Sequence, residues 1–127
     1  METTQKTTIE TTYEQPAFCQ LFTGADQVTR YGKHIATTGA IETAETFSCY
    51  WFLDVICSYQ IYRKFQNEDF QVWELKRNTF NGDEFTVTAT DGNCNVLATQ
   101  KIPFSDYQEN YLKMYFIDGT ILLPTEY

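Results

Sequence analysis

The chain lacks the groupings of cysteine and histidine that usually indicate a metal site or a disulfide framework. It has a single histidine, His34, and four cysteines, at positions 19, 49, 57 and 94, none of them in a CxxC pair. Cys49 and Cys57 are separated by about two turns of the helix predicted below, too far for a disulfide bond. We therefore expect free thiols and neither a metal nor another cofactor.

A targeting or membrane-spanning segment is also missing. The N-terminus has no basic region followed by an apolar stretch, and the most apolar segment of the chain carries Asp54 near its middle. These features predict a cytoplasmic protein that does not enter a membrane.

Basic residues are scarce, with nine Lys and Arg against seventeen Asp and Glu, and the formal net charge is −8. A protein that binds nucleic acid by neutralising phosphates needs a basic patch, and an anionic membrane surface attracts the same kind of patch. We therefore expect neither direct nucleic-acid binding nor attachment to an anionic membrane.

Acidic residues dominate the part of the chain after Phe80, which has seven of them against two basic residues. They form either a solvated surface that keeps the protein in solution or a negative face that docks on a basic partner. The residues of this predicted face are Asp83, Glu84, Asp91, Asp106, Glu109 and Asp118.

Apolar residues make up 43% of the 127-residue chain, and aromatic residues alone make up 17%. This length and composition predict one domain with a core rich in aromatic rings. The exception is the threonine-rich beginning, which offers few large apolar groups for burial. We expect residues 1–14 to form a flexible tail and residues 15–127 to form the domain.

The segment Ala44–Phe65, AETFSCYWFLDVICSYQIYRKF, is the one stretch long and apolar enough to form a buried helix. Its apolar residues occur on nearly all helical faces, which is typical of a helix buried on several sides. Acidic residues precede it and basic residues end it, as the helix dipole favours. The pattern predicts one long helix from about Ala40 to Phe65, with a break near Thr46–Ser48 as the alternative.

A period of two replaces the helical period after Asp69. The alternation predicts strands in FQVWELKRN, EFTVTATDG and VLATQKI, joined by hairpins at Asn81-Gly82 and in DGNCN. Two further short strands are expected on either side of Asp118-Gly119. The predicted fold is α+β, with one long central helix packed on an antiparallel meander of three to five strands.

Asp54 is the residue that the predicted fold explains least, because a carboxylate on an apolar helix needs partners or a raised pKa. One interpretation is an acid that binds a ligand in a pocket, together with Tyr50, Trp51, Arg30 and His34. The other is an acid that accepts hydrogen bonds from a backbone terminus, a Tyr hydroxyl or an Arg. The sequence places no second carboxylate or nucleophile beside Asp54, so it supports no catalytic mechanism.

Several separated segments resemble an uncharacterised family of small bacterial domains of unknown function. Their order along the chain is the same, and together they span most of residues 20–127. The resemblance implies a single domain and supports the helix boundary, but it implies no activity and no catalytic residue. The segments are FTG..Q..RYG, TTGAIETAETF.CYWFLDVICSYQ, FQVWELK, DGN and the terminal DGTILLPTEY.

Three functions are compatible with these observations. The first is a non-enzymatic interaction protein, such as an inhibitor from a phage or mobile element that docks on a basic, nucleic-acid-handling host defence protein. The alternative is a small-ligand or nucleotide-binding domain with its pocket between helix and sheet. An enzyme that uses Asp54 or His34 as a base ranks last. Homodimerisation through an open edge of the short C-terminal strands is a further expectation.

Overall fold

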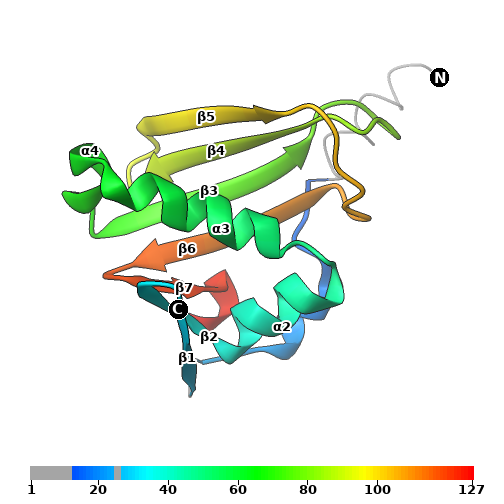
Figure 1. Ribbon diagram of the computed structural model, residues 1–127. Helices are drawn as coiled ribbons and strands as arrows, with labels where there is room; N and C mark the ends of the chain where they lie inside the picture. The colour runs from blue at the N-terminus through cyan, green and yellow to red at the C-terminus, as the bar shows by residue number, and fades with distance from the viewer. Residues whose placement is uncertain (1–12, 25–26) are drawn as a thin grey trace.

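The structure is a computed structural model that describes residues 13–24 and 27–127. The described residues form an α+β fold in which one sheet carries helices on one face (Figure 1). Its strands are β1 (Val28–Tyr31), β2 (His34–Thr37), β3 (Phe70–Arg77), β4 (Phe85–Asp91), β5 (Val96–Ile102), β6 (Tyr111–Ile117) and β7 (Thr120–Leu122). Their order across the sheet is β1-β2-β7-β6-β3-β4-β5. Among these strands, β2 and β7 run parallel and the other neighbours run antiparallel.

The helices of the described chain are short. They are α2 (Thr38–Thr46), α3 (Tyr50–Ser58) and α4 (Arg63–Gln66), with the 3-10 helices η1 (Ala17–Leu21), η2 (Tyr59–Ile61) and η3 (Pro124–Glu126). α3 lies over the middle of the sheet, and α2 contacts β2 and β7 (Figure 1). Among the residues that the structure describes, no helix is both long and apolar enough to cross a membrane.

The prediction of one long central helix is wrong, because the chain leaves the helical conformation at Ser48. Ser48 has a φ of 55°, in the left-handed region. Its N–H donates to the carbonyl of Glu45 at 3.2 Å, and the N–H of Cys49 donates to the carbonyl of Ala44 at 2.8 Å. These two bonds form a Schellman motif, which ends α2 by satisfying its last carbonyls. The alternative prediction, a break near Thr46–Ser48, is confirmed, but the helix after the break is short instead of long.

The chain turns a second time after α3, where the long helix was predicted to continue. Tyr62 is extended, with φ −88° and ψ 138°, and separates η2 from α4. This turn brings the rings of Tyr59 and Phe65 to centroid distances of 5.5 and 5.8 Å from the ring of Trp73 on β3. The long-range packing of these rings outweighs the local preference for helix.

The prediction of a meander of three to five strands is also wrong, although its three central strands lie where the sequence placed them. β3, β4 and β5 pair antiparallel through hairpins at the predicted turns. The sheet then continues on the other side of β3 with β6. Next to β6 lies β7, which pairs antiparallel with β6 and parallel with β2. The β3–β6 pairing links distant segments, so local alternation does not indicate it.

The two C-terminal strands, predicted to leave a pairable edge, both lie inside the sheet. β6 is between β3 and β7, and β7 is between β6 and β2. The open edges belong to β1 and β5. Self-association of the protein stays a prediction, and edge-to-edge pairing would have to use one of these two strands.

The helix-facing side of the sheet forms the core. On β3, the side chains of Gln71, Trp73 and Leu75 are buried, as the alternation predicted. The apolar members of this set belong to one cluster with Phe52 and Leu53 of α3. Burying side chains of this size stabilises the fold by about 1.5–3 kcal/mol each.

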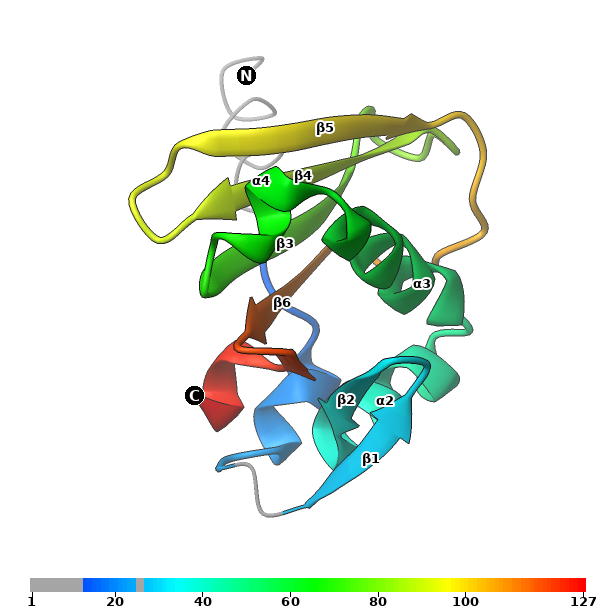
Figure 2. The ribbon, with the colours of Figure 1, turned by 60° about the vertical axis from the view of Figure 1, so that its left-hand side comes forward.

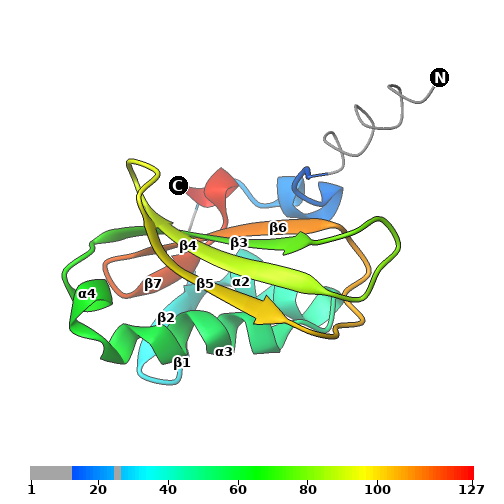
Figure 3. The same cartoon turned by 90° about the horizontal axis from the view of Figure 1, so that it is seen from above.

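The opposite face of the sheet is covered by the two ends of the described chain. The ring of Tyr127 lies 5.4 and 5.7 Å from the rings of Phe70 and Tyr115. Gln15 exchanges two hydrogen bonds of 2.7 Å with the backbone of Lys113. Figure 3 shows η3, just before the C-terminus, on the side of the sheet opposite α3.

Most of the predicted tail, residues 1–12, lies outside the described residues. Tyr13, close to the end of that tail, contacts the sheet. Its ring is 6.1 Å from the ring of Tyr111, and its hydroxyl donates to the carbonyl of Arg77.

The left-handed conformation of Ser48 leads to a stability prediction. Replacing Ser48 with Gly should raise the free energy of unfolding by about 0.5–1 kcal/mol, because glycine adopts a positive φ without steric cost. Ser48→Val should lower it by about 1–2 kcal/mol. Denaturant unfolding followed by tryptophan fluorescence measures both changes. Ser58→Gly, at the last residue of α3 where φ is −65°, is the matched control and should destabilise. A loss of stability in Ser48→Gly would contradict the left-handed conformation at position 48.

Candidate functional site

Asp54 belongs to α3, and its carboxylate contacts Tyr31 of the β1–β2 hairpin. Figure 2 shows this hairpin together with α3. The Tyr31 hydroxyl of the hairpin donates to Asp54 Oδ1, and the Tyr31 ring stacks on Tyr50 with centroids 6.3 Å apart. Asp54 is exposed rather than buried. Its carboxylate thus has the tyrosine partner that one interpretation required, and it also lines a cavity, as the other required.

The Tyr31 hydroxyl is a donor in this contact at neutral pH. Burial, and after it the hydrogen bond to Asp54, raise the pKa of Tyr31 well above its usual value. The proton therefore stays on the tyrosine oxygen, and Asp54 Oδ1 is the acceptor.

A cavity of about 480 Å³ opens between this hairpin and the segment from α3 to α4. Asp54 and His34 both line it, together with Tyr31, Cys57 and Gln66. The His34 ring sits edge-on to the ring of Phe116, with centroids 5.2 Å apart. The structure therefore brings two of the sequence-predicted site residues, Asp54 and His34, to one cavity.

The other three predicted ligand-binding residues do not line this cavity. Tyr50 stacks on the Tyr31 ring, and Trp51 packs edge-on to Phe52 with centroids 6.1 Å apart. Arg30 is exposed and adjacent to Tyr31 on β1, so its side chain lies on the opposite face of the sheet.

Gln60, which lines the cavity, belongs to a buried amide network that the sequence did not indicate. Gln60 Nε2 donates to Gln71 Oε1 at 2.8 Å, and Gln71 Nε2 donates back to Gln60 Oε1 at 3.0 Å. Gln71 Oε1 also accepts from Trp73 Nε1 at 3.0 Å. Gln71 Nε2 further donates to the carbonyls of Phe65 and Glu68. The buried amides of Gln60 and Gln71 and the indole N–H of Trp73 therefore all have hydrogen-bond partners.

A second cavity, of about 210 Å³, adjoins the first, because His34, Gln60 and Gln66 line both. On its far side it reaches the β6–β7 turn and the start of β3. Its acidic lining residues are Glu68, Asp69 and Asp118.

The six residues of the predicted acidic face do not share one face. Four of them lie in two loops at one end of the sheet, at residues 78–84 and 103–110, and Asp91 and Asp118 lie at the other end. Asp91 accepts hydrogen bonds from Asn95 and Asn93, which lower its pKa, and so stabilises the β4–β5 turn. The four residues of the first end are Asp83, Glu84, Asp106 and Glu109.

Arg77 holds the two loops of that first end together. Its Nε donates to Asn110 Oδ1 at 2.9 Å, and its Nη2 donates to the carbonyls of Tyr107 and Glu109 at 2.8 and 3.0 Å. Its Nη1 donates to the carbonyl of Gly82 in the other loop. A guanidinium that spans both loops in this way keeps them in one arrangement.

The same two loops expose two large rings. Phe80 is 67% exposed and Phe104 is 70% exposed. The loops touch where the N–H of Ser105 donates to the carbonyl of Asp83 at 2.9 Å. We call the 78–84 and 103–110 loops together the acidic loop end. Sequence reasoning found its carboxylates but missed the exposed rings, because phenylalanine ordinarily indicates core.

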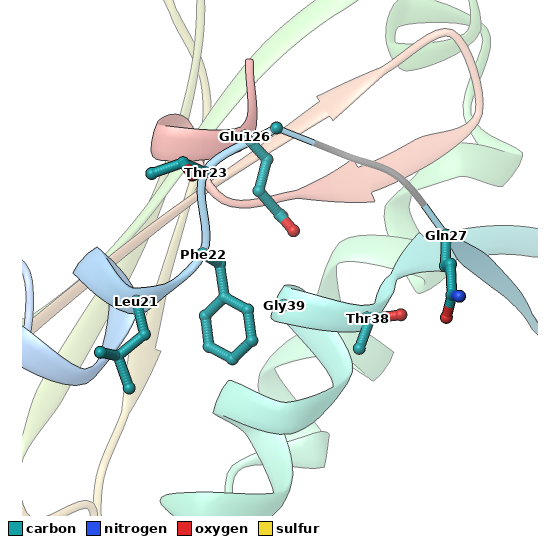
Figure 4. Close-up of a pocket in the computed structure, with 8 residues that line it drawn as sticks. Leu21, Phe22, Thr23, Gln27, Thr38, Gly39 and Glu126 are labelled. Atoms are coloured by element: carbon teal, nitrogen blue, oxygen red, sulfur yellow. The ribbon is translucent and has the colours of Figure 1, made fainter.

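A further cavity, of about 280 Å³, lies where the C-terminus meets the start of α2 (Figure 4). Glu126 points toward Gly39 there, and its Oε1 accepts hydrogen bonds from Thr37 Oγ1 at 2.6 Å and from the N–H of Leu123 at 2.9 Å. The carboxylate thus lies at the positive end of α2. The glutamate of the terminal LLPTEY segment has a structural role here.

The cysteines are free, as the sequence predicted. Burial raises the pKa of Cys19 and of Cys57 to about 11 and that of Cys49 to about 12. These thiols are protonated at neutral pH and are not poised as nucleophiles. In the part of the chain that the structure describes, no three His, Cys, Asp or Glu residues are grouped to hold a metal ion.

Comparison with known families gives one match. Residues 12–127 match the model of a family described as "Family of unknown function (DUF6876)". No curated protein and no solved structure matches the chain. The resemblance to an uncharacterised family that the sequence suggested is confirmed.

The contact between Gly39 and Glu126 leads to a stability prediction. A Cβ atom on Gly39 would lie 2.5 Å from Glu126 Oε2 and 2.9 Å from Cγ of Phe22. Gly39→Ala should therefore lower the free energy of unfolding by about 1–3 kcal/mol, although alanine is the better helix former. Thermal and denaturant unfolding measure the change. Glu42→Ala, at an exposed position of α2, should be nearly neutral; an equally neutral Gly39→Ala would contradict this placement of Glu126.

The thiols should differ in their reactivity. Cys94 is exposed and should react first with iodoacetamide, whereas Cys19 and Cys49 should react only after unfolding. The half-buried Cys57 should react faster as the pH rises from 7 towards 10, by about tenfold per unit, because its pKa lies above this range. Peptide mass spectrometry of timed samples follows each site. A pH-independent rate at Cys57 would show that opening of the fold limits the reaction.

Proposed function

Since the chain belongs to this family of unknown function, we propose from its own structure that it is a non-enzymatic interaction protein that docks on a basic surface of a protein partner. The acidic loop end supports the proposal. It displays the exposed rings of Phe80 and Phe104 among four carboxylates. Neither loop contains a lysine or an arginine. Exposed rings surrounded by charge of one sign are typical of a docking surface.

The two rings supply the affinity in this proposal. A phenylalanine that moves from water into a partner's apolar pocket gains about 1.5–3 kcal/mol. Because Arg77 already holds both loops, little conformational entropy is lost when the partner binds. The acidic loop end therefore has the rigid aromatic residues that dominate binding energies at interfaces.

The carboxylates make the site specific for a partner with a basic surface. Lys101 pairs with Glu84 at 3.1 Å, and the acidic loop end remains negative with Asp83, Asp106 and Glu109. A basic groove that ordinarily holds nucleic-acid phosphates fits this charge, so the protein would act as an inhibitor that competes with nucleic acid. Free thiols agree with a cytosolic setting for this encounter, because the cytosol keeps cysteines reduced.

The test compares capture of partners by the full-length chain and by a variant of the acidic loop end. The tagged wild-type protein should retain a stoichiometric partner with a basic surface from lysate of its own host. The double variant Phe80→Ser/Phe104→Ser should bind that purified partner at least about 100-fold more weakly, since each ring contributes about 1.5 kcal/mol or more. Wild-type binding should weaken as the salt concentration rises, and nucleic acid should compete with it.

A matched variant at the opposite end of the sheet provides the control. Val96 is 63% exposed, and Asp118 is exposed in the β6–β7 turn. Val96→Ser/Asp118→Asn should leave the affinity unchanged. Equal binding by the Phe80→Ser/Phe104→Ser protein, or an affinity that does not respond to salt, would contradict the proposal.

A further inference from the structure

The two cavities on either side of His34 form one continuous groove, because they share the lining residues His34, Gln60 and Gln66. We call it the His34 groove. Its two parts measure about 480 and 210 Å³, which is the size range of small-molecule sites. The groove lies at the end of the sheet that carries the β6–β7 turn, away from the acidic loop end.

Gln60 lines both parts of the groove, and hydrogen bonds within the protein already engage its amide, so it offers little to a ligand. The two amide groups of Gln60 and Gln71 bond to each other and to neighbouring backbone carbonyls. The rings of Tyr31 and His34 line the larger part of the groove, and those of His34 and Phe116 line the smaller part. Such a surface suits a slender apolar chain, which aromatic rings contact without needing hydrogen bonds.

The ends of the groove are negative. Asp54 lines the part on one side of His34, and Glu68, Asp69 and Asp118 line the part on the other side. Lys33, at the hairpin tip, is the one lysine or arginine among the described lining residues. The groove therefore has carboxylates in both of its parts, and the rings of Tyr31, His34 and Phe116 line the wall with them.

We propose that the His34 groove binds a linear diamine or polyamine, with an ammonium group near Asp54, another near Asp118, and the methylene chain along the rings between them. Carboxylates accept hydrogen bonds from ammonium groups, and aromatic faces attract cations. A nucleotide fits less well, because its phosphate would approach four carboxylates with one lysine to offset them. This site goes beyond the docking function and does not depend on it.

Spermidine is the probe for this site. Titration of the ¹⁵N-labelled full-length chain should shift amide signals around Asp54, His34 and Asp118, and calorimetry should give a one-to-one complex. Removing one carboxylate by Asp54→Asn or Asp118→Asn should weaken binding about tenfold, as loss of one charge-assisted hydrogen bond predicts. Asparagine tolerates the left-handed φ of 52° at position 118, so the turn is kept. Bound spermidine should also slow the alkylation of Cys57.

Asp106→Asn is the matched control, because it makes the same change of charge at the acidic loop end. It should bind spermidine as the wild type does. Propylamine, with one ammonium group, should bind at least about tenfold more weakly than spermidine, and adenosine monophosphate should not shift the groove signals. An equal loss in Asp106→Asn would show general attraction to an acidic protein and overturn the proposal. So would preferential binding of the nucleotide, or no groove shifts at millimolar spermidine.

Discussion

Much of the structure depends on the hydrogen bonds of one buried group, the carboxamide of Gln71. It lies on β3, and it bonds to Gln60 of η2, to the indole of Trp73 and to the carbonyls of Phe65 and Glu68. These contacts fasten the turn after α3 to the sheet. Loss of this one amide would leave several buried polar groups unpaired, which costs more than the bonds themselves contribute. Its partner Gln60 lines both parts of the His34 groove.

The sheet presents different chemistry at its two ends. Arg77 joins two loops at one end and leaves Phe80 and Phe104 in water, an arrangement that suits a protein surface. At the other end, the β1–β2 hairpin and the β6–β7 turn enclose cavities lined by rings and carboxylates, which suits a small cation. Both sites carry an excess of carboxylates. They therefore differ in their position and shape and not in the sign of their charge.

The candidate sites were predictable in part. The sequence identified Asp54 as unusual and His34 as a candidate partner, and both line one cavity. It anticipated a Tyr hydroxyl as one possible partner of Asp54 but did not identify Tyr31, because that pairing joins a hairpin to a helix more than twenty residues away. It grouped Arg30 with them as a candidate ligand-binding residue, but alternation along β1 directs Arg30 to the face of the sheet opposite Tyr31. Arg77 and Gln71 looked like ordinary strand residues, since only their distant partners distinguish them.

The sequence by itself determined the α+β class, the family and the strands β3, β4 and β5 with their turns. Alternating side chains and tight-turn residues are local signals, so a short stretch of sequence is enough to predict these strands and turns. The tertiary structure decided between one long helix and a broken one, which the sequence left open, and it alone decided where the chain turns after α3 and how the sheet continues. Ser48 carries the left-handed turn that glycine usually marks, and the β3–β6 and β2–β7 pairings join segments far apart. The apolar stretch Ala44–Phe65 therefore forms short helices, because ring packing on Trp73 and the buried Gln71 network stabilise the turned chain more than a continued helix would.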